Sequence, residues 1–409
     1  MPTYSGSKKI LIVDFMYPLP ENLGRRMRTM NFVRFFRKYG PVDLLYFYRE
    51  SEEVEDKDVF HKEYYIRHPS CDGEIEKSWN RKAMGRLNRF LEKRPWMITE
   101  WPPQASREYI SIINDGNYDI IFCRYILETS PLFQLPMEQR KRVVLDYDDI
   151  FSDSLYGYHA ANDEKISSSV KGKIQKHFLF HYEKKCLDFG VVLFTTRTDR
   201  EKVAGNNKKQ NAFVVPNIYP GNHFHEGMEC GYPKRNIFLF VGALNYGPNV
   251  EGLKWFIETI FQRVQKHVEN PMLIVAGRQP TPEVKTLCNS VPNIELHPDV
   301  PDVKPLYQQS GVVIVPILTA GGTRIKILEA GIAGRPLLST PMGAHGLDAI
   351  DGKDLFLFND EHSFMEGYQK LQDKAVYDSM AGNMKSLVHD LYSPESFQRK
   401  MEEAIRSLM

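Results

Sequence analysis

The chain has 409 residues, enough for two or three domains with sizeable cores. Its 53 lysines and arginines nearly balance its 52 aspartates and glutamates, so bulk charge gives no reason to expect binding to nucleic acid. The five cysteines are scattered and lack a CxxC spacing, which argues against a disulfide framework or a structural metal and fits a reducing cytosol. The sequence shows neither a signal-peptide core nor an apolar run of the roughly 18 residues that span a membrane, so we expect a cytoplasmic protein.

The first half opens as an α/β domain. Residues 9–15 (KILIVDF) form a short apolar run typical of a buried strand. The Pro/Gly loop of residues 17–24 follows it, at the carboxyl edge where open α/β sheets bind their ligands. Residues 25–39 predict a helix, because apolar side chains recur on one face and arginines occupy the others. Residues 42–48 and 118–124 predict two further strands.

Residues 77–94 form a basic amphipathic stretch, in which lysines and arginines alternate with large apolar side chains. Two interpretations are open. The stretch is a helix that lies on an anionic membrane surface, or it is a helix that faces the core with its basic side in solvent.

Residues 143–150 (VVLDYDDI) predict a strand that ends in the acids Asp146, Asp148 and Asp149. Carboxylates at this edge of a sheet lie where a binding site forms. They can bind acceptor hydroxyls, act as a base, or cap the following helix, and capping is favoured for any single one of them.

Residues 217–234 are polar and rich in glycine and proline, which predicts the junction between two domains. The second half starts afresh with its own strand at residues 236–241, and strands alternate with helices in both halves. The sequence therefore predicts two doubly wound, Rossmann-like α/β domains with parallel sheets that face a central cleft. We expect domains over residues 1–216 and 217–392, with a last helix over residues 393–409 that returns to the first domain.

Residues 312–346 combine an apolar strand, a glycine pair and a helix with Glu329 in its middle. Backbone N–H groups and the dipole at a helix N-terminus attract an anion, and Arg324 and Lys326 add cations there. The stretch is either a site for the diphosphate of a nucleotide or an ordinary connection between strands.

Several segments, in this order along the chain, carry a family likeness: LFVGALNYGPNVEGLKWF (239–256), IVAGRQP (274–280), DVKPLYQQSGVVIVP (302–316), GGTRIKILEAGIAGRPLLST (321–340) and GAHGL (343–347). They resemble the nucleotide-sugar-binding domain of GT-B glycosyltransferases, in particular the group 1 or family-4-like enzymes of bacterial surface polysaccharide assembly. PENLGRRMRT (20–29) and VVLDYDDI (143–150) are similar to the first domain of these enzymes. The resemblance implies transfer of a sugar from a nucleotide-diphospho-sugar to a glycan or lipid-linked acceptor, with retention of configuration and with no metal or other cofactor.

The resemblance also implies roles for donor-site residues. Glu329 would bind the ribose hydroxyls, because an ionised carboxylate accepts hydrogen bonds from two hydroxyls. Gly242 would let the donor approach the backbone, and Arg278 would cover the base or the phosphates. The remaining donor-site residues are Asn245 and the turn residues Gly322, Thr323 and Arg324, which would meet the diphosphate.

The residues expected to carry catalysis are Arg324, Lys326 and Asp148, which stands where many family members have a histidine. The two cations would offset the charge that grows on the departing diphosphate, although Lys326 could instead pair with Glu329. Acceptor contacts would come from the first domain, from Asn22, Gly24, Arg25, Asp146 and Asp149.

Two departures from the family pattern keep other functions open. Gly321 stands where many members have a glutamate, and Ala243 stands where an arginine is usual. The alternatives are a GT-B protein that binds nucleotide or glycan without turnover, or a nucleotide-sugar epimerase.

The expected partners are a UDP- or GDP-linked donor, a glycan or lipid-linked acceptor and an anionic membrane surface, with the protein peripheral at the inner face of the membrane.

Overall fold

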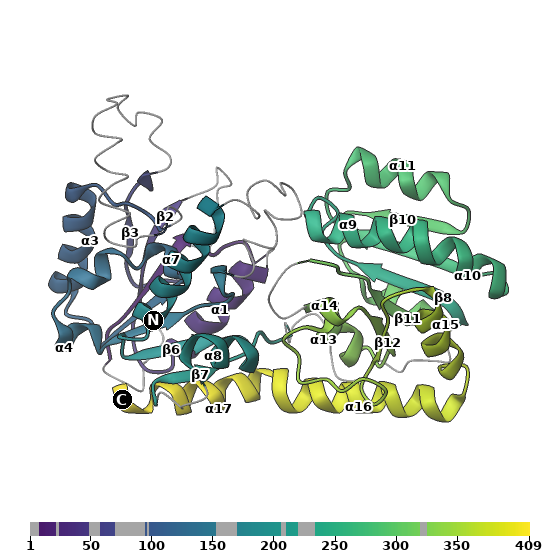
Figure 1. Cartoon of the computed structure of the whole chain (residues 1–409). Coiled ribbons are helices and arrows are strands. Elements are labelled where there is room, and N and C mark those ends of the chain that lie inside the picture. Colours follow the sequence, from purple (N-terminus) through teal and green to yellow (C-terminus); the bar gives the residue numbers. More distant parts are fainter. Residues whose placement is uncertain are drawn as a thin grey trace. The chain divides into compact units, whose positions relative to one another are not determined.

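Two parallel sheets, one in each half of the chain, organise the computed structural model (Figure 1). The chain divides into unit 1, with Met1–Val215 and Gln398–Met409, and unit 2, with Pro216–Phe397. The structure describes residues 8–21, 24–48, 58–69, 95, 98–152, 170–205, 210–219, 234–319 and 325–409.

Unit 1 contains a seven-stranded sheet in the order β3-β2-β1-β4-β5-β6-β7, and each adjacent pair is parallel. The strands are β1 (Ile10–Met16), β2 (Val42–Tyr48), β3 (Glu63–Tyr65), β4 (Ile120–Arg124), β5 (Val143–Asp146), β6 (Val191–Phe194) and β7 (Ala212–Val214). The central strands are continuous apolar runs because helices cover both of their faces. Their carboxyl ends lie at one edge of the sheet, where Arg124 and Asp146 end β4 and β5.

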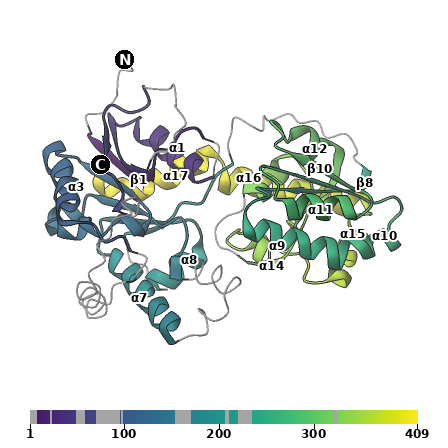
Figure 2. The same cartoon turned by 90° about the horizontal axis from the view of Figure 1, so that it is seen from above.

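The helices in the described part of unit 1 are α1 (Gly24–Phe36), α3 (Pro103–Gly116), α4 (Met137–Arg140), α7 (Val170–Cys186), α8 (Arg197–Ala204) and the short 3-10 turns η2 (Ile126–Glu128) and η3 (Pro131–Gln134). The end of α17 (Pro394–Ile405) and the turn η5 (Arg406–Leu408) also belong to this unit. Figure 2 shows α17 beside α1, and Lys38, just after α1, donates a hydrogen bond of 2.5 Å to Gln398.

Unit 2 contains a six-stranded sheet in the order β10-β9-β8-β11-β12-β13, again with parallel pairs. The strands are β8 (Lys234–Val241), β9 (Met272–Gly277), β10 (Ile294–Pro298), β11 (Ser310–Val315), β12 (Leu337–Ser339) and β13 (Phe356–Leu357). The helical segments are α9 (Gly247–Trp255), the π-helical η4 (Phe256–Phe261), α10 (Gln262–His267), α11 (Pro282–Ser290), α12 (Lys304–Gln309), α13 (Ile325–Ile332), α14 (Pro341–Ala344), α15 (Glu361–Lys370) and α16 (Lys374–Tyr392).

Alternate residues of β8 point into two different cores. Phe238 and Phe240 pack in a core with side chains of α9, η4, α11 and α15, whereas Leu239 packs in a core with side chains of α12, α13 and α16. This alternation is the pleat of a strand that is covered on both faces. The prediction of doubly wound parallel sheets in both halves is therefore confirmed.

Two further expectations concern membranes. The basic stretch of residues 77–94 lies outside the described residues. Within the described ranges, no helix is long and apolar enough to cross a membrane.

Candidate functional site

Two glycines bring the ends of β8 and β9 into close contact. The Gly242 N–H donates to the Ala276 carbonyl at 3.0 Å, and the Leu244 N–H donates to the Arg278 carbonyl at 2.8 Å. A Cβ at Gly277 would lie 1.7 Å from the Gly242 carbonyl oxygen, so only glycine fits there. The two loops that follow these strands are thus joined at the carboxyl edge of the sheet.

Lys326 fills the space beside Gly242. Its Nζ donates a hydrogen bond of 2.8 Å to Oδ1 of Asn249 and lies 4.8 Å from the centroid of the Phe240 ring. The Asn249 amide in turn donates to the Ala243 carbonyl at 2.9 Å. A Cβ at Gly242 would lie only 2.9 Å from Nζ. Gly242 was predicted to let the donor approach because it has no side chain. In the structure, the space that a side chain would fill holds the ammonium of Lys326.

Glu329 follows Lys326 by one helical turn on α13. The hydroxyl of Tyr307, a buried residue of α12, donates a hydrogen bond of 3.1 Å to its Oε2. Burial raises the pKa of Glu329 to about 7, against the opposing effects of this hydrogen bond and of the Lys326 charge. The carboxyl group can thus gain or lose its proton near neutral pH.

Asn245 and Arg278 belong to the same pair of loops and are exposed. The Asn245 amide donates to the side chain of Gln279 at 2.5 Å. The predicted donor-site residues Gly242, Asn245 and Arg278 thus lie at the carboxyl ends of β8 and β9, and the predicted catalytic residue Lys326 lies beside Gly242 at the start of α13. The predicted residues Gly322, Thr323 and Arg324 lie outside the described part of the chain, as does Asn22 in unit 1.

Asp146 is fully buried at the end of β5 and is held by two arginines. Arg28 forms a bidentate pair with it: its Nε donates to Oδ2 at 2.9 Å and a terminal guanidinium nitrogen donates to Oδ1 at 2.6 Å. The Nε of Arg124, at the end of β4, lies 3.3 Å from Oδ2. The predicted role of Asp146 in acceptor binding stays a prediction, but its present contacts are those of a structural ion pair.

Asp148 lies next to this pair with left-handed backbone geometry (φ 57°). Its Oδ2 accepts hydrogen bonds from Arg124 at 2.7 Å and from the Tyr125 hydroxyl at 2.9 Å. Burial alone would raise the pKa of Asp148, but the charges of Arg124 and Arg28 outweigh burial and hold the pKa below its usual value. Asp148 is therefore an ionised carboxylate at neutral pH, and its side chain is 19% exposed.

Arg25 lies in the first turn of α1, directly after Gly24, beside the same cluster. The carbon centre of its guanidinium is 4.2 Å from the Tyr125 ring centroid and 5.3 Å from that of Phe15. The third predicted acid, Asp149, is partly buried and its N–H donates to the Tyr147 carbonyl at 2.7 Å. Unit 1 thus gathers Gly24, Arg25 and the acids at the carboxyl edge of its sheet.

Sequence reasoning missed Asn249, Tyr307, Arg28, Arg124 and Tyr125. One signal was available for Arg124, because it ends an apolar strand whose neighbour in the sheet ends in acids. Asn249 and Tyr307 carry no comparable signal, since each acts through a residue far along the chain.

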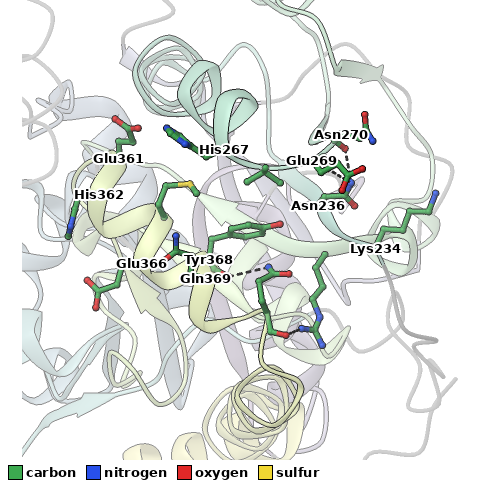
Figure 3. Close-up of a pocket in the computed structure, with 14 residues that line it drawn as sticks. Lys234, Asn236, His267, Glu269, Asn270, Glu361, His362, Glu366, Tyr368 and Gln369 are labelled. Carbon is green, nitrogen blue, oxygen red and sulfur yellow. Dashed lines mark hydrogen bonds between the residues drawn. The ribbon is translucent and has the colours of Figure 1, made fainter.

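A broad polar hollow of about 1270 Å³ lies elsewhere in unit 2 (Figure 3). It is lined by the amino end of β8, the end of α10 and one face of α15, with His267, His362 and Glu366 among its side chains. The predicted donor-site residues Gly242 and Asn245 follow the opposite, carboxyl end of β8. Among the described residues, no group of three or more His, Cys, Asp or Glu side chains is arranged to hold a metal ion.

Comparison with known proteins assigns this geometry to a family. Residues 235–374, which contain Gly242, Asn249, Lys326 and Glu329, match the family described as Glycosyl transferases group 1. Residues 235–374 are therefore a glycosyltransferase group 1 domain. A curated relative, an uncharacterized 44.6 kDa protein in the cps region of Klebsiella pneumoniae, is 23% identical over 374 residues, which are 87% of this chain and 89% of the relative.

Solved structures of glycosyltransferases match over nearly the whole chain. Sucrose-phosphate synthase from Thermosynechococcus elongatus has a TM-score of 0.67 at 14% identity and covers 98% of this chain and 99% of its own. A glycosyltransferase from Rickettsia africae has a TM-score of 0.62 at 13% identity over 99% of both chains. HepE from Anabaena, solved with UDP and glucose, has a TM-score of 0.59 at 11% identity and covers 98% of this chain and 100% of its own. These structures show the GT-B fold, and the predicted resemblance is confirmed.

Proposed function

We propose that this glycosyltransferase moves a sugar from a nucleotide-diphospho-sugar to a hydroxyl of a glycan or lipid-linked acceptor, with retention of configuration. One observation carries the donor half of the proposal. Lys326 and Glu329 lie one turn apart on α13, with an ammonium fixed beside Gly242 and a carboxylate held by Tyr307. A cation next to a carboxylate suits a ligand that has both a diphosphate and a sugar with free hydroxyls.

In the reaction, the bond between the sugar C1 and the diphosphate oxygen breaks, and a bond from C1 to the acceptor oxygen forms. The diphosphate gains negative charge as it leaves, and the ammonium of Lys326 stabilises that charge. The acceptor hydroxyl gives its proton to the departing diphosphate oxygen, so the products are the glycoside and the protonated nucleoside diphosphate. Arg324, Gly322 and Thr323 are proposed from the sequence resemblance to assist Lys326, so that helix N-terminal groups and side-chain cations do the work a metal does in other transferases.

The acceptor half rests on unit 1. Asp148 is an ionised, partly exposed carboxylate, which suits it to accept a hydrogen bond from an acceptor hydroxyl. Arg25, Gly24, Asn22 and Asp149 are the proposed neighbours of the acceptor. The cps region named for the Klebsiella relative and the glycosyltransferase structures with UDP support a polysaccharide precursor as acceptor and a UDP-linked sugar as donor, with a GDP-linked sugar as the second choice.

Mass spectrometry of the protein incubated with a set of UDP- and GDP-sugars tests the proposal. Release of UDP or GDP, by transfer or by slow hydrolysis, is the expected result. Binding without turnover would instead indicate a GT-B protein that has lost activity, and an isomerised but intact donor would indicate an epimerase. NMR of the anomeric proton in the product distinguishes retention from inversion.

Membrane association is a separate proposal for residues 77–94, whose basic side chains would bind anionic lipid. It is tested by sedimentation with phosphatidylglycerol vesicles at increasing salt concentration. The attraction between solvent-exposed charges weakens as the salt concentration increases, so binding should decrease. Binding that does not change with salt, or no binding, would contradict it.

A further inference from the structure

Lys326 is a cation in a place that its own helix disfavours. It lies near the N-terminal end of α13, and that end of a helix carries the positive pole of the dipole. The Phe240 ring, 4.8 Å from Nζ, offsets part of this cost through a cation–π contact. An anion bound here would interact favourably with both the ammonium and the helix end.

Asn249 determines where this ammonium lies. Its side chain is buried, with 7% exposed, and it bridges two groups from other elements. The Ala243 carbonyl can only accept, so it fixes Nδ2 at 2.9 Å and leaves Oδ1 to face Lys326 Nζ at 2.8 Å. The orientation of the amide is therefore set before any ligand binds.

The choice of an amide at position 249 has an electrostatic consequence. A carboxylate there would hold the ammonium at least as strongly but would cancel its charge. The neutral Asn249 oxygen holds Lys326 in place and leaves its positive charge to act on a ligand. Gly242 makes the arrangement possible, since a Cβ there would lie 2.8 Å from Asn249 Nδ2 and 2.9 Å from Lys326 Nζ.

We propose that Asn249 is a positioning residue that orients Lys326 toward the diphosphate of the donor. This inference rests on the proposed function, because the diphosphate is its ligand. It assigns to Asn249 no contact with the sugar or the base.

Calorimetric titration with UDP and with uridine, which lacks phosphates, tests the inference. Asn249→Ala should weaken UDP binding about tenfold, the effect of losing one hydrogen bond to a charged group, and should leave uridine binding unchanged. Asn249→Asp should weaken UDP binding further, because it neutralises the ammonium. In a Lys326→Ala background, Asn249→Ala should have no additional effect. If the wild type binds GDP more tightly than UDP, the titrations use GDP and guanosine in place of UDP and uridine.

Asn236→Ala is the matched control. The Asn236 amide also makes two hydrogen bonds, to the carbonyls of Glu269 at 3.0 Å and Asn270 at 2.7 Å, but at the opposite end of β8 (Figure 3). This variant should bind UDP and uridine like the wild type. The thermal midpoint of each variant is measured as well, and Asn249→Ser, which keeps a small polar side chain, replaces Asn249→Ala if the latter does not fold.

Three results would overturn the inference. One is an equal loss of UDP and uridine affinity in Asn249→Ala, which indicates a general structural role. Another is the same loss of UDP affinity with and without Lys326. The third is a wild type that binds UDP and an Asn249→Ala variant that binds it equally well. A wild type that binds neither UDP nor GDP would instead overturn the proposed function itself.

Discussion

The Tyr307 hydroxyl donates a hydrogen bond of 3.1 Å to Oε2 of Glu329, from helix α12 to helix α13. Burial raises the pKa of Glu329 to about 7, and this hydrogen bond acts in the opposite direction because it favours the charged carboxylate. Any contact that requires the carboxylate of Glu329 therefore depends on pH in the neutral range and on Tyr307.

Tyr307→Phe should shift the pH dependence of nucleotide binding. If the Glu329 carboxylate accepts hydrogen bonds from the ribose, UDP affinity falls as the pH drops below about 7, where the group protonates. The variant loses a hydrogen bond to the charged form, so the pKa rises and the fall begins at higher pH. Titration calorimetry on both sides of neutrality measures the midpoint.

Tyr392→Phe is the control for that experiment, because the Tyr392 hydroxyl is also buried in unit 2 and accepts a hydrogen bond of 2.9 Å from the Asp348 N–H. Its midpoint should equal that of the wild type. An unchanged midpoint in Tyr307→Phe would contradict the prediction.

Glu329→Gln should alter how stability depends on pH. The pKa of Glu329 is raised from 4.5 to about 7, so between these values the folded protein binds more protons than the unfolded chain. The free energy of unfolding therefore falls as the pH rises through this window, by up to roughly 3 kcal/mol. The glutamine variant lacks this fall. Urea denaturation of both proteins at several pH values measures the difference, and parallel profiles would refute the prediction.

Gly277→Ala should destabilise unit 2 strongly. The added Cβ would lie 1.7 Å from the Gly242 carbonyl oxygen. This backbone atom cannot move aside without disrupting the hydrogen bonds that join the ends of β8 and β9. We expect a loss of about 3 kcal/mol or more, typical of severe overpacking. Gly382→Ala, within α16, is the comparison, because its Cβ would meet nothing within 4 Å. That variant should gain up to about 1 kcal/mol through helix propensity. Thermal and urea unfolding distinguish the two, and equal stabilities would disprove the packing argument.

Asp146→Ala should destabilise unit 1 by about 3–5 kcal/mol, because it removes the fully buried carboxylate that pairs with both Arg28 and Arg124 and leaves them only the partly exposed Asp148. Asp115→Ala, which removes an exposed carboxylate of the same unit, should change stability by less than about 0.5 kcal/mol. The comparison is made by urea unfolding. A loss in Asp146→Ala as small as in the control would show that the ion pairs contribute little.

The fold could be predicted because buried parallel strands are continuous apolar runs. The run at residues 236–241 became β8 and the run at residues 312–316 became β11, each displaced by at most two residues at either end. The side chains that support the site could not be predicted in this way. Asn249 lies 77 residues before Lys326, and Tyr307 lies 22 residues before Glu329, so their roles exist only once the sheet has assembled.

The acids of residues 143–150 show the same limit. Their position at a strand end was evident from the sequence, but their partners were not. Asp146 pairs with Arg28 across 118 residues, and only the order of strands in the sheet brings the two together. The local sequence pattern thus located the candidate carboxylates. Only the structure shows that Asp146 is in a buried ion pair whereas Asp148 is partly exposed.

Unit 2 is one uninterrupted stretch, Pro216–Phe397, whereas unit 1 combines the beginning of the chain with its last residues, Gln398–Met409. Within that last stretch, Met401 and Ile405 are fully buried, so they are part of what holds unit 1 together. During synthesis, unit 1 can therefore complete its core only after residues 398–409 have been translated, whereas all residues of unit 2 are available before them. A premature stop codon just before Gln398 would accordingly damage unit 1 and spare unit 2, which carries Lys326 and Glu329.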